Sequence, residues 1–125
     1  MITHQKQALI LFDQWNNAIE TKDPDTVTEL YADDAILLPT LSNTICNSHE
    51  KIRNYFITFL KKGPSGVINE SNSREFSDLI IHSGIYTFSF ENQSSATARF
   101  SYVHSLIDNE WKIIEHHSSL LPESR

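Results

Sequence analysis

The sequence predicts a single α+β domain in which helices pack on one face of an antiparallel sheet. The first half of the chain carries apolar residues at the three- and four-residue spacing of helices. The second half carries β-branched and aromatic segments that alternate with turn signals. The 125 residues suffice for one hydrophobic core but not for two ordinary domains. We therefore expect one domain over residues 1–125.

Three helices are predicted in the first half. The first covers residues 4–21, with apolar residues on one side at Ala8, Leu11, Phe12, Trp15, Ala18 and Ile19. Asp23 followed by Pro24 is typical of an N-cap and a first helical residue, so a short second helix begins here. We expect Val27, Leu30 and Tyr31 on its buried side and Asp33-Asp34 at its end.

The third predicted helix begins after Ser48, whose hydroxyl can accept a hydrogen bond from the first turn. Its apolar side carries Ile52, Tyr55, Phe56, Phe59 and Leu60. The run Gly63-Pro64-Ser65-Gly66 ends it, because glycine and proline interrupt the helical backbone.

Extended segments account for most of the remaining chain. A short apolar run at 35–38 precedes the third helix, and the longer segments are 74–82, 84–91, 95–106 and 110–119. Turn signals separate the longer segments at Ser83-Gly84, Glu91-Asn92-Gln93 and Asp108-Asn109. The pattern predicts an antiparallel meander.

Composition excludes several classes of partner. The chain has 16 acidic and 10 basic residues and a net charge of −6, and its basic residues are scattered, so we expect no nucleic acid partner. No apolar run approaches the roughly 18 residues of a spanning helix, so we expect no membrane insertion. One cysteine cannot form an internal disulfide, and the first residues lack the features of a signal peptide. We expect a cytoplasmic protein.

Several stretches carry a family resemblance. Leu11-Phe12-Asp13-Gln14-Trp15-Asn16, Asp23-Pro24 and Leu30-Tyr31-Ala32-Asp33-Asp34-Ala35 resemble the opening of nuclear-transport-factor-2-like proteins. Within that superfamily, the chain is similar to bacterial relatives of the calcium/calmodulin-dependent kinase II association (hub) domain. Ile52-Arg53-Asn54-Tyr55-Phe56 and residues 108–119 extend the similarity over nearly the whole chain.

The resemblance implies a cystatin-like, nuclear-transport-factor-2-like cone, in which three N-terminal helices pack on a curved antiparallel sheet. A conical cavity would lie between them, and the outer face of the sheet would serve self-association. The chain has no glycine-rich loop, catalytic loop or basic amphipathic helix, so kinase activity and calmodulin binding do not carry over.

Self-association is also expected from the apolar residues of the sheet. Phe88, Phe90, Trp111 and Ile113 are expected to be distributed over both faces, which gives more apolar surface than three helices can cover. We therefore expect a homodimer or a larger ring joined through the sheet.

The functional hypothesis is a self-associating domain whose cavity binds a small organic molecule. One alternative is a small cofactor-independent cyclase, isomerase or dehydratase that uses His116 with a tyrosine or arginine. A second alternative is a pure oligomerisation module, for which the cavity would be filled by side chains. Fold alone does not choose among these.

The cone implies a set of pocket residues. The helices and the segment after the second helix would supply an apolar wall, and the sheet would supply the polar floor. The wall candidates are Trp15, Tyr31, Tyr55 and Phe59, and the floor candidates are Tyr102 and His116.

Arg99 is a further pocket candidate whose position depends on the register of the last hairpin. A simple two-residue turn puts Ser101 opposite His116 and Arg99 opposite Ser118, which would form a polar patch for an anionic or carbonyl ligand. A register shifted by one residue brings His116 beside Tyr102 and leaves Arg99 outside.

No metal or cofactor is expected. His116 and His117 are neighbours on a predicted strand, so they face opposite sides of the sheet and cannot bind one metal together. Cys46 has no cationic neighbour in the sequence, which is typical of an inert thiol.

Overall fold

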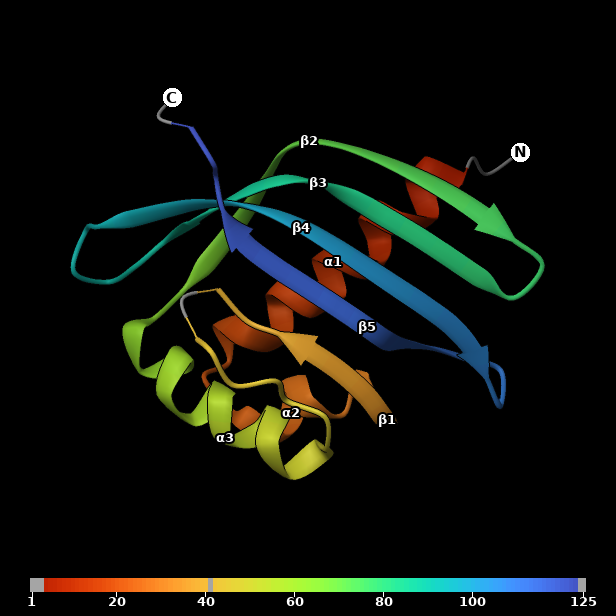
Figure 1. The fold of residues 1–125 in the computed structure, drawn as a ribbon, viewed down its shortest axis with the longest axis horizontal. Coiled ribbons are helices and arrows are strands. Elements are labelled where there is room, and N and C mark those ends of the chain that lie inside the picture. The colour runs from red at the N-terminus through yellow and green to blue at the C-terminus, as the bar shows by residue number, and fades with distance from the viewer. Residues whose placement is uncertain (1–3, 41, 124–125) are drawn as a thin grey trace.

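A computed structural model describes residues 4–40 and 42–123. Figure 1 shows the order of elements, in which three helices and one strand precede a meander of four long strands. The elements are α1 (His4–Glu20), α2 (Pro24–Thr28), β1 (Tyr31–Leu38), α3 (His49–Phe59), the 3₁₀ helix η1 (Leu60–Lys62), β2 (Ser65–Phe76), β3 (Leu79–Ser89), β4 (Ser95–Ile107) and β5 (Glu110–Leu120).

The five strands form one sheet in the order β1-β5-β4-β3-β2. The pairs from β2 to β5 are antiparallel, and β1 lies parallel to β5 at one edge. The long strands curve, and α1 crosses behind them while α2 and α3 lie near β1 (Figure 1). The predicted α+β class, with helices on a curved and mostly antiparallel sheet, is confirmed.

The helix boundaries follow local chemistry as predicted. The Asp23 side chain accepts a hydrogen bond from the Asp25 backbone N–H, and Pro24 occupies the first helical position of α2. The Ser48 hydroxyl accepts from the Lys51 N–H at the start of α3. Gly63 ends η1 with a φ of 62°, a left-handed conformation that glycine adopts at low cost.

The second helix ends earlier than predicted. It stops at Thr28, and Tyr31 already begins β1, where it pairs with Ile113. Asp33 and Asp34 lie within the strand rather than at the end of a helix, and both are exposed. The Tyr31 ring is buried, and its burial in the core overrides the local turn signal of the two aspartates. The pairing of β1 with β5 is irregular between Tyr31 and the next paired residue, Ile36.

The turn predicted at Ser83-Gly84 is wrong. β3 runs unbroken through this position, and the turn between β2 and β3 lies at residues 77–78. β2 also begins earlier than predicted, at Ser65. Its residues are mostly polar, and all except Gly66 are exposed or half-buried, because β2 forms an open edge of the sheet. They therefore lack the apolar alternation of a central strand.

Gly84 marks a close approach between strands. A Cβ at this position would lie 2.1 Å from the Glu70 carbonyl oxygen and 2.7 Å from the Ser71 Cα. β2 carries an extra residue here, because the pairing register shifts between Ile68 and Glu70. A glycine in a strand interior therefore indicates a bulge on the neighbouring strand in this chain.

The last hairpin combines both register alternatives. Its turn is a simple two-residue one at residues 108–109, with φ angles of 51° and 66°, as the sequence indicated. β5 then carries one extra residue, Ile114, between the partners of Val103 and His104. This bulge shifts the remaining pairing by one residue.

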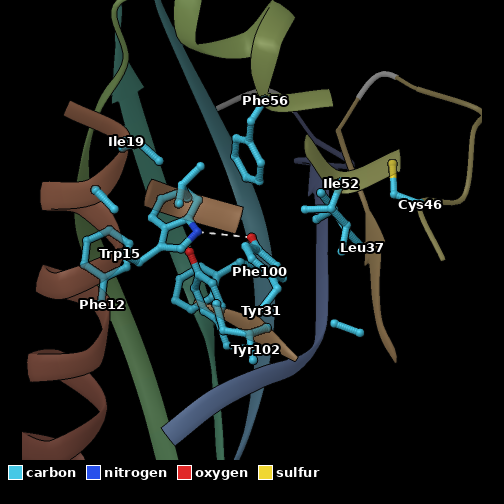
Figure 2. Close-up of a cluster of buried hydrophobic side chains, with 14 of the residues drawn as sticks. Phe12, Trp15, Ile19, Tyr31, Leu37, Cys46, Ile52, Phe56, Phe100 and Tyr102 are labelled. Carbon is cyan, nitrogen blue, oxygen red and sulfur yellow. Dashed lines mark hydrogen bonds between the residues drawn. The ribbon is translucent and has the colours of Figure 1, made fainter. Parts of the chain in front are cut away.

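The core lies between the helices and the inner face of the sheet. Figure 2 shows Phe12 and Trp15 of α1 directed toward Tyr31, Phe100 and Tyr102. All five residues are at most 5% exposed. The helices therefore cover an aromatic face of the sheet.

The outer face is less apolar than predicted. Phe88, Phe90, Trp111 and Ile113 all belong to or pack against the clusters on the helix side, instead of being distributed over both faces. Alternation along each strand sends the large rings inward together. The outer face carries half-buried Ile81, Ile85 and Val103 among polar and charged residues. Among the helices described, none is both long and apolar enough to span a membrane.

Candidate functional site

A cavity of about 570 Å³ opens between the helices and the inner face of the sheet. α1 and α3 supply one wall, and β3, β4 and β5 supply the other. Most of the lining is apolar and aromatic. The lining residues are Trp15, Leu37, Pro39, Thr40, Ser42, Tyr55, Phe56, Thr58, Phe59, Lys62, Tyr86, Phe88, Phe90, Ala96, Ala98, His116, Ser118 and Leu120.

Polar side chains meet at one part of the cavity wall. His116 Nδ1 lies 2.8 Å from the Tyr31 hydroxyl, and His116 Nε2 lies 3.3 Å from the Tyr86 hydroxyl. The Tyr86 hydroxyl donates to Ser118 Oγ at 2.8 Å, and Ser118 Oγ lies 2.6 Å from Thr40 Oγ1. These groups form a continuous hydrogen-bonded chain from β1 across β5 to β3.

The donors in this chain fix the tautomer of His116. Because the Tyr86 hydroxyl gives its hydrogen to Ser118, its oxygen accepts from His116 Nε2–H. Nδ1 is then the acceptor, and Tyr31 donates to it. The Tyr31 oxygen in turn accepts from Trp15 Nε1–H at 3.1 Å, the dashed contact in Figure 2. His116 is therefore a neutral hydrogen-bonding group with the proton on Nε2.

Burial keeps this network uncharged. Burial, together with smaller contributions from charge repulsion by His104 and His117, lowers the pKa of His116 to about 3. Burial also raises the pKa of both tyrosines, well above the ordinary value for Tyr31. At neutral pH these side chains donate and accept hydrogen bonds without carrying charge.

The mouth of the cavity has a different character. Lys62 is exposed, and its Nζ lies 5.8 Å from the centre of the Phe90 ring. Tyr55 and Phe59 of α3 stack with ring centres 5.6 Å apart, and Phe59 meets Phe90 edge-on at 6.1 Å. Lys62 is the only lysine or arginine among the described lining residues.

The structure brings most of the predicted pocket residues together. Trp15, Tyr55, Phe59 and His116 line the cavity. Tyr31 and Tyr102 lie one layer behind, each 1% exposed. Tyr31 contacts His116 by hydrogen bond, and the Tyr102 ring stacks on the imidazole with centres 4.1 Å apart. These two tyrosines position His116 instead of forming the wall.

Arg99 is not part of the cavity. It pairs with Ser119 across β4 and β5 and is exposed on the outer face, together with His117. The bulge at Ile114 is the cause, because it gives the register that excludes Arg99. Arg99 instead borders a shallow polar hollow of about 480 Å³ on the outer face.

Sequence reasoning missed several lining residues. Tyr86 and Phe88 alternate on a segment predicted as a strand, so that alternation was a signal for their placement on one face. Thr40 and Ser118 carried no such signal, because 78 positions separate them and only the β1–β5 pairing brings them together. Lys62 directly follows the third helix, where a positive charge is favourable in any case, so its sequence position gave no sign of a lining role.

Other reactive groups lie outside the cavity. Cys46 is 3% exposed, and burial raises the pKa of its thiol, as expected of an inert cysteine. Asp33 and Asp34 face solvent. Among residues 4–40 and 42–123, no three His, Cys, Asp or Glu side chains gather as a metal site. The expectation that the protein uses no metal or cofactor stays a prediction.

Solved structures with this architecture are known. A calcium/calmodulin dependent protein kinase II association domain from Xanthomonas campestris is 44% identical and has a TM-score of 0.91, with 95% of this chain and 89% of that chain covered. More distant structures share the fold alone. A nuclear transport factor 2-like protein from Salmonella enterica is 14% identical (TM-score 0.79, 98% and 94% covered). A Parabacteroides distasonis structure described as a ketosteroid isomerase is 18% identical (TM-score 0.76, 94% and 87% covered).

No curated protein sequence is significantly similar to the chain. The family model of the calcium/calmodulin dependent protein kinase II association domain matches residues 4–122. This match spans the helices and the whole sheet, including every residue that lines the cavity. The chain belongs to the calcium/calmodulin dependent protein kinase II association domain family.

Proposed function

We propose that this domain self-associates and binds a small organic molecule in its cavity, without kinase activity of its own. The observation that carries the ligand-binding part is the cavity of about 570 Å³, which combines an aromatic lining with converging hydroxyl and imidazole groups. Apolar burial supplies affinity in such sites, and a few polar groups fix the orientation of the ligand.

The open cavity favours this proposal over a pure oligomerisation module. A module of that kind would be expected to fill the cone with side chains, since an empty interior costs stability. Here the aromatic residues of α3 stack along the wall and leave the space between wall and floor open.

The enzyme alternative has less support. General acid–base catalysis at neutral pH needs a group whose pKa lies near the operating pH. Burial lowers the pKa of His116 to about 3, and the described lining residues include no aspartate or glutamate. The likeness to a structure described as a ketosteroid isomerase is one of fold.

Self-association is supported by the family, whose description is that of an association domain. The outer face offers a surface with half-buried Ile85 and Val103 and with charges of both signs, such as Arg99 and Glu115. A two-fold arrangement can pair opposite charges across such a face. We expect an interface of roughly 1,000 Å² or more. The absence of a nucleic acid partner and the cytoplasmic location stay predictions.

Ligand binding is tested by filling the cavity. Ala96 on β4 lines it, and its neighbour Thr97 points to the outer face. We expect thermal-shift screening of small phenols, ketones and aromatic acids to find stabilising compounds for the wild type and for Thr97→Phe. Ala96→Phe should abolish those shifts while remaining folded. Equal shifts in both variants would put the binding site elsewhere.

Self-association is tested by light scattering at micromolar concentration. We expect an oligomer for the wild type and for Ala96→Phe, because that change lies inside the cone. Val103→Asp should give a monomer, because it puts a charge into the outer face. A wild type that stays monomeric would overturn the self-association part and leave the ligand-binding part standing.

A further inference from the structure

The outer face of the sheet carries a row of four residues, one from each long strand, that combines charges with apolar surface. Strand pairing places Arg74 of β2 opposite Ile81 of β3. It also places Val103 of β4 between Ile81 and Glu115 of β5. These four residues are called the outer row. Its order across the sheet is basic, apolar, apolar and acidic.

Alternation along the strands directs the outer row away from the helices. Ile81 lies between Ile80 and His82, which are at most 1% exposed on the inner face. Val103 alternates with buried residues of β4 in the same way. Arg74 is exposed and the other three members are half-buried, so a second protein chain can cover all four.

The charged ends of the outer row do not pair with each other within one chain. Arg74 and Glu115 belong to β2 and β5, and β3 and β4 lie between these strands. Neighbouring strands are about 4.8 Å apart, which separates the two backbones by roughly 14 Å. No ion pair joins the two side chains in the part of the chain that the structure describes.

A second copy of the chain supplies the missing partners when a two-fold axis runs along the strands between β3 and β4. Figure 1 shows these two strands in the middle of the four long ones. Rotation about this axis lays the outer row of the second copy over that of the first in reversed order. Arg74 then faces Glu115 of the second copy, and the reverse contact forms at the other end. Ile81 packs on Val103 of the second copy, as in two aligned sheets.

A two-fold axis across the strands fits the residues less well. If that axis followed the neighbouring row, which contains Ser101 and His117, it would place Val103 opposite Arg99 of the second copy. Glu115 would face Ser119 instead of a cation. An apolar side chain would then cover a charge, and that charge loses hydration without gaining a partner. The charge pattern therefore favours the axis along the strands.

We propose that two copies of this chain form a closed dimer through the outer row, with Arg74 of each copy paired to Glu115 of the other and Ile81 packed on Val103. This inference rests on the proposed self-association and specifies its surface, its symmetry and its ion pairs. Each copy uses the same surface, so the contact is complete with two copies and does not extend into a ring. A larger assembly requires a second surface.

Charge reversal tests the two ion pairs. Arg74→Glu places acids opposite each other at both ends of the interface, and Glu115→Arg places bases there. Each variant alone should therefore dimerise at least about tenfold more weakly than the wild type. An equimolar mixture of the two should regain nearly the wild-type Kd, because every contact between the two variants again joins opposite charges. Native mass spectrometry identifies the mixed dimer by its mass, and sedimentation equilibrium gives the Kd.

Control variants exclude a general effect of charge or of folding. The double variant Arg74→Glu/Glu115→Arg should dimerise with itself about as tightly as the wild type, because both ion pairs form in the opposite sense. Lys51→Glu, an exposed reversal on α3, should change nothing. Far-ultraviolet circular dichroism checks that each variant is folded.

The results distinguish this dimer from self-association in general. A wild-type oligomer that neither reversal weakens would overturn the proposed interface and leave self-association standing. Weakened single variants that do not recover when mixed would contradict the axis along the strands. A ring larger than a dimer that dissociates on Arg74→Glu would contradict the closed two-fold contact. A wild type that stays monomeric at micromolar concentration would contradict both this dimer and the proposed self-association.

Discussion

The two faces of β4 differ in every respect that matters for stability. Phe100, Tyr102 and His104 point inward and are at most 5% exposed, whereas Arg99 and Ser101 point outward and contact solvent or small polar neighbours. β5 repeats the contrast in adjacent positions. One side of the sheet carries the hydrophobic core and the cavity, and the other side is polar and faces solvent.

Two neighbouring histidines of β5 lie on opposite faces of the sheet and differ in burial and contacts. His116 is 3% exposed and hydrogen bonds to two tyrosines, whereas His117 is exposed beside Ser101. A single extra residue, Ile114, sets the register that places each against its partner. The chemistry of a histidine in this sheet therefore depends on strand register more than on the residue itself.

The largest predicted effect of the inner face is a loss of folding stability at acidic pH. Burial lowers the pKa of His82 and His104 to about 4 and that of His116 to about 3. In the unfolded chain each titrates near 6.5, so the unfolded state binds more protons between about pH 6.5 and 4. Stability is therefore full above pH 6.5 and falls on acidification, by about 1.4 kcal/mol per pH unit for each histidine. Urea unfolding at several pH values measures this slope.

Variants on the two faces of the sheet show which face causes the pH dependence of stability. His104→Gln should reduce the pH dependence by about one third, since one of three buried groups is removed. Ser101→Ala on the outer face, which removes no titratable group, should leave it unchanged. The Nδ1 atoms of His82 and His104 lack a hydrogen-bond partner in the described structure, so nothing there offsets a new charge. Equal slopes for wild type and His104→Gln would contradict this account.

Truncation of adjacent residues on β4 should give the next largest contrast. Phe100 is 3% exposed and stacks on Tyr86 with ring centres 4.6 Å apart, so Phe100→Ala should lower the free energy of unfolding by about 3–5 kcal/mol. Ser101→Ala should change it by less than about 0.5 kcal/mol. Chemical denaturation of both variants tests the comparison, and similar values for the two would refute it.

Removal of the imidazole between the tyrosines should have a somewhat smaller effect. His116→Ala leaves the Tyr31 hydroxyl without its acceptor and removes the ring that stacks on Tyr102. We expect a loss of about 2–4 kcal/mol, because each unsatisfied buried group costs about 1–3 kcal/mol. His117→Ala is the matched control and should be nearly neutral by the same denaturation assay.

The smallest predicted effect concerns the close approach at the bulge of β2. Gly84→Ala adds a methyl group that would lie 2.1 Å from the Glu70 carbonyl oxygen, so β2 must move. We expect a cost of about 1–3 kcal/mol. Gly84→Ser should be at least as destabilising, and hydrogen exchange should show the loosening in β2 and not in β5. A neutral Gly84→Ala would mean that the bulge has room to move.

Much of the fold could be predicted because local chemistry agrees with it. The apolar side of α1, Ser48 before α3 and the turn at 108–109 each depend on residues close in sequence. The polar edge strand β2 and the interior position of Gly84 could not be read in this way. An edge strand needs no apolar alternation, and a serine-glycine pair is ordinarily a turn signal.

The cavity was harder to predict than the fold. Trp15 and Phe59 follow from helix faces, and His116 follows from its strand. The error for Arg99 comes from the bulge at Ile114, for which the sequence offers no marker. Thr40 joins the site only through pairing of distant strands, which local patterns do not encode.

The parallel pairing of β1 with β5 has a consequence for the order of folding. β1 has no strand neighbour except β5, and its Tyr31 meets His116 across 85 positions of the chain. Closing so long a loop is entropically costly and slows folding. During synthesis, the hairpins of β2, β3 and β4 can form as they emerge from the ribosome. The edge strand β1 cannot join the sheet until β5 is made, so the cavity is completed only after nearly all of the domain has been translated.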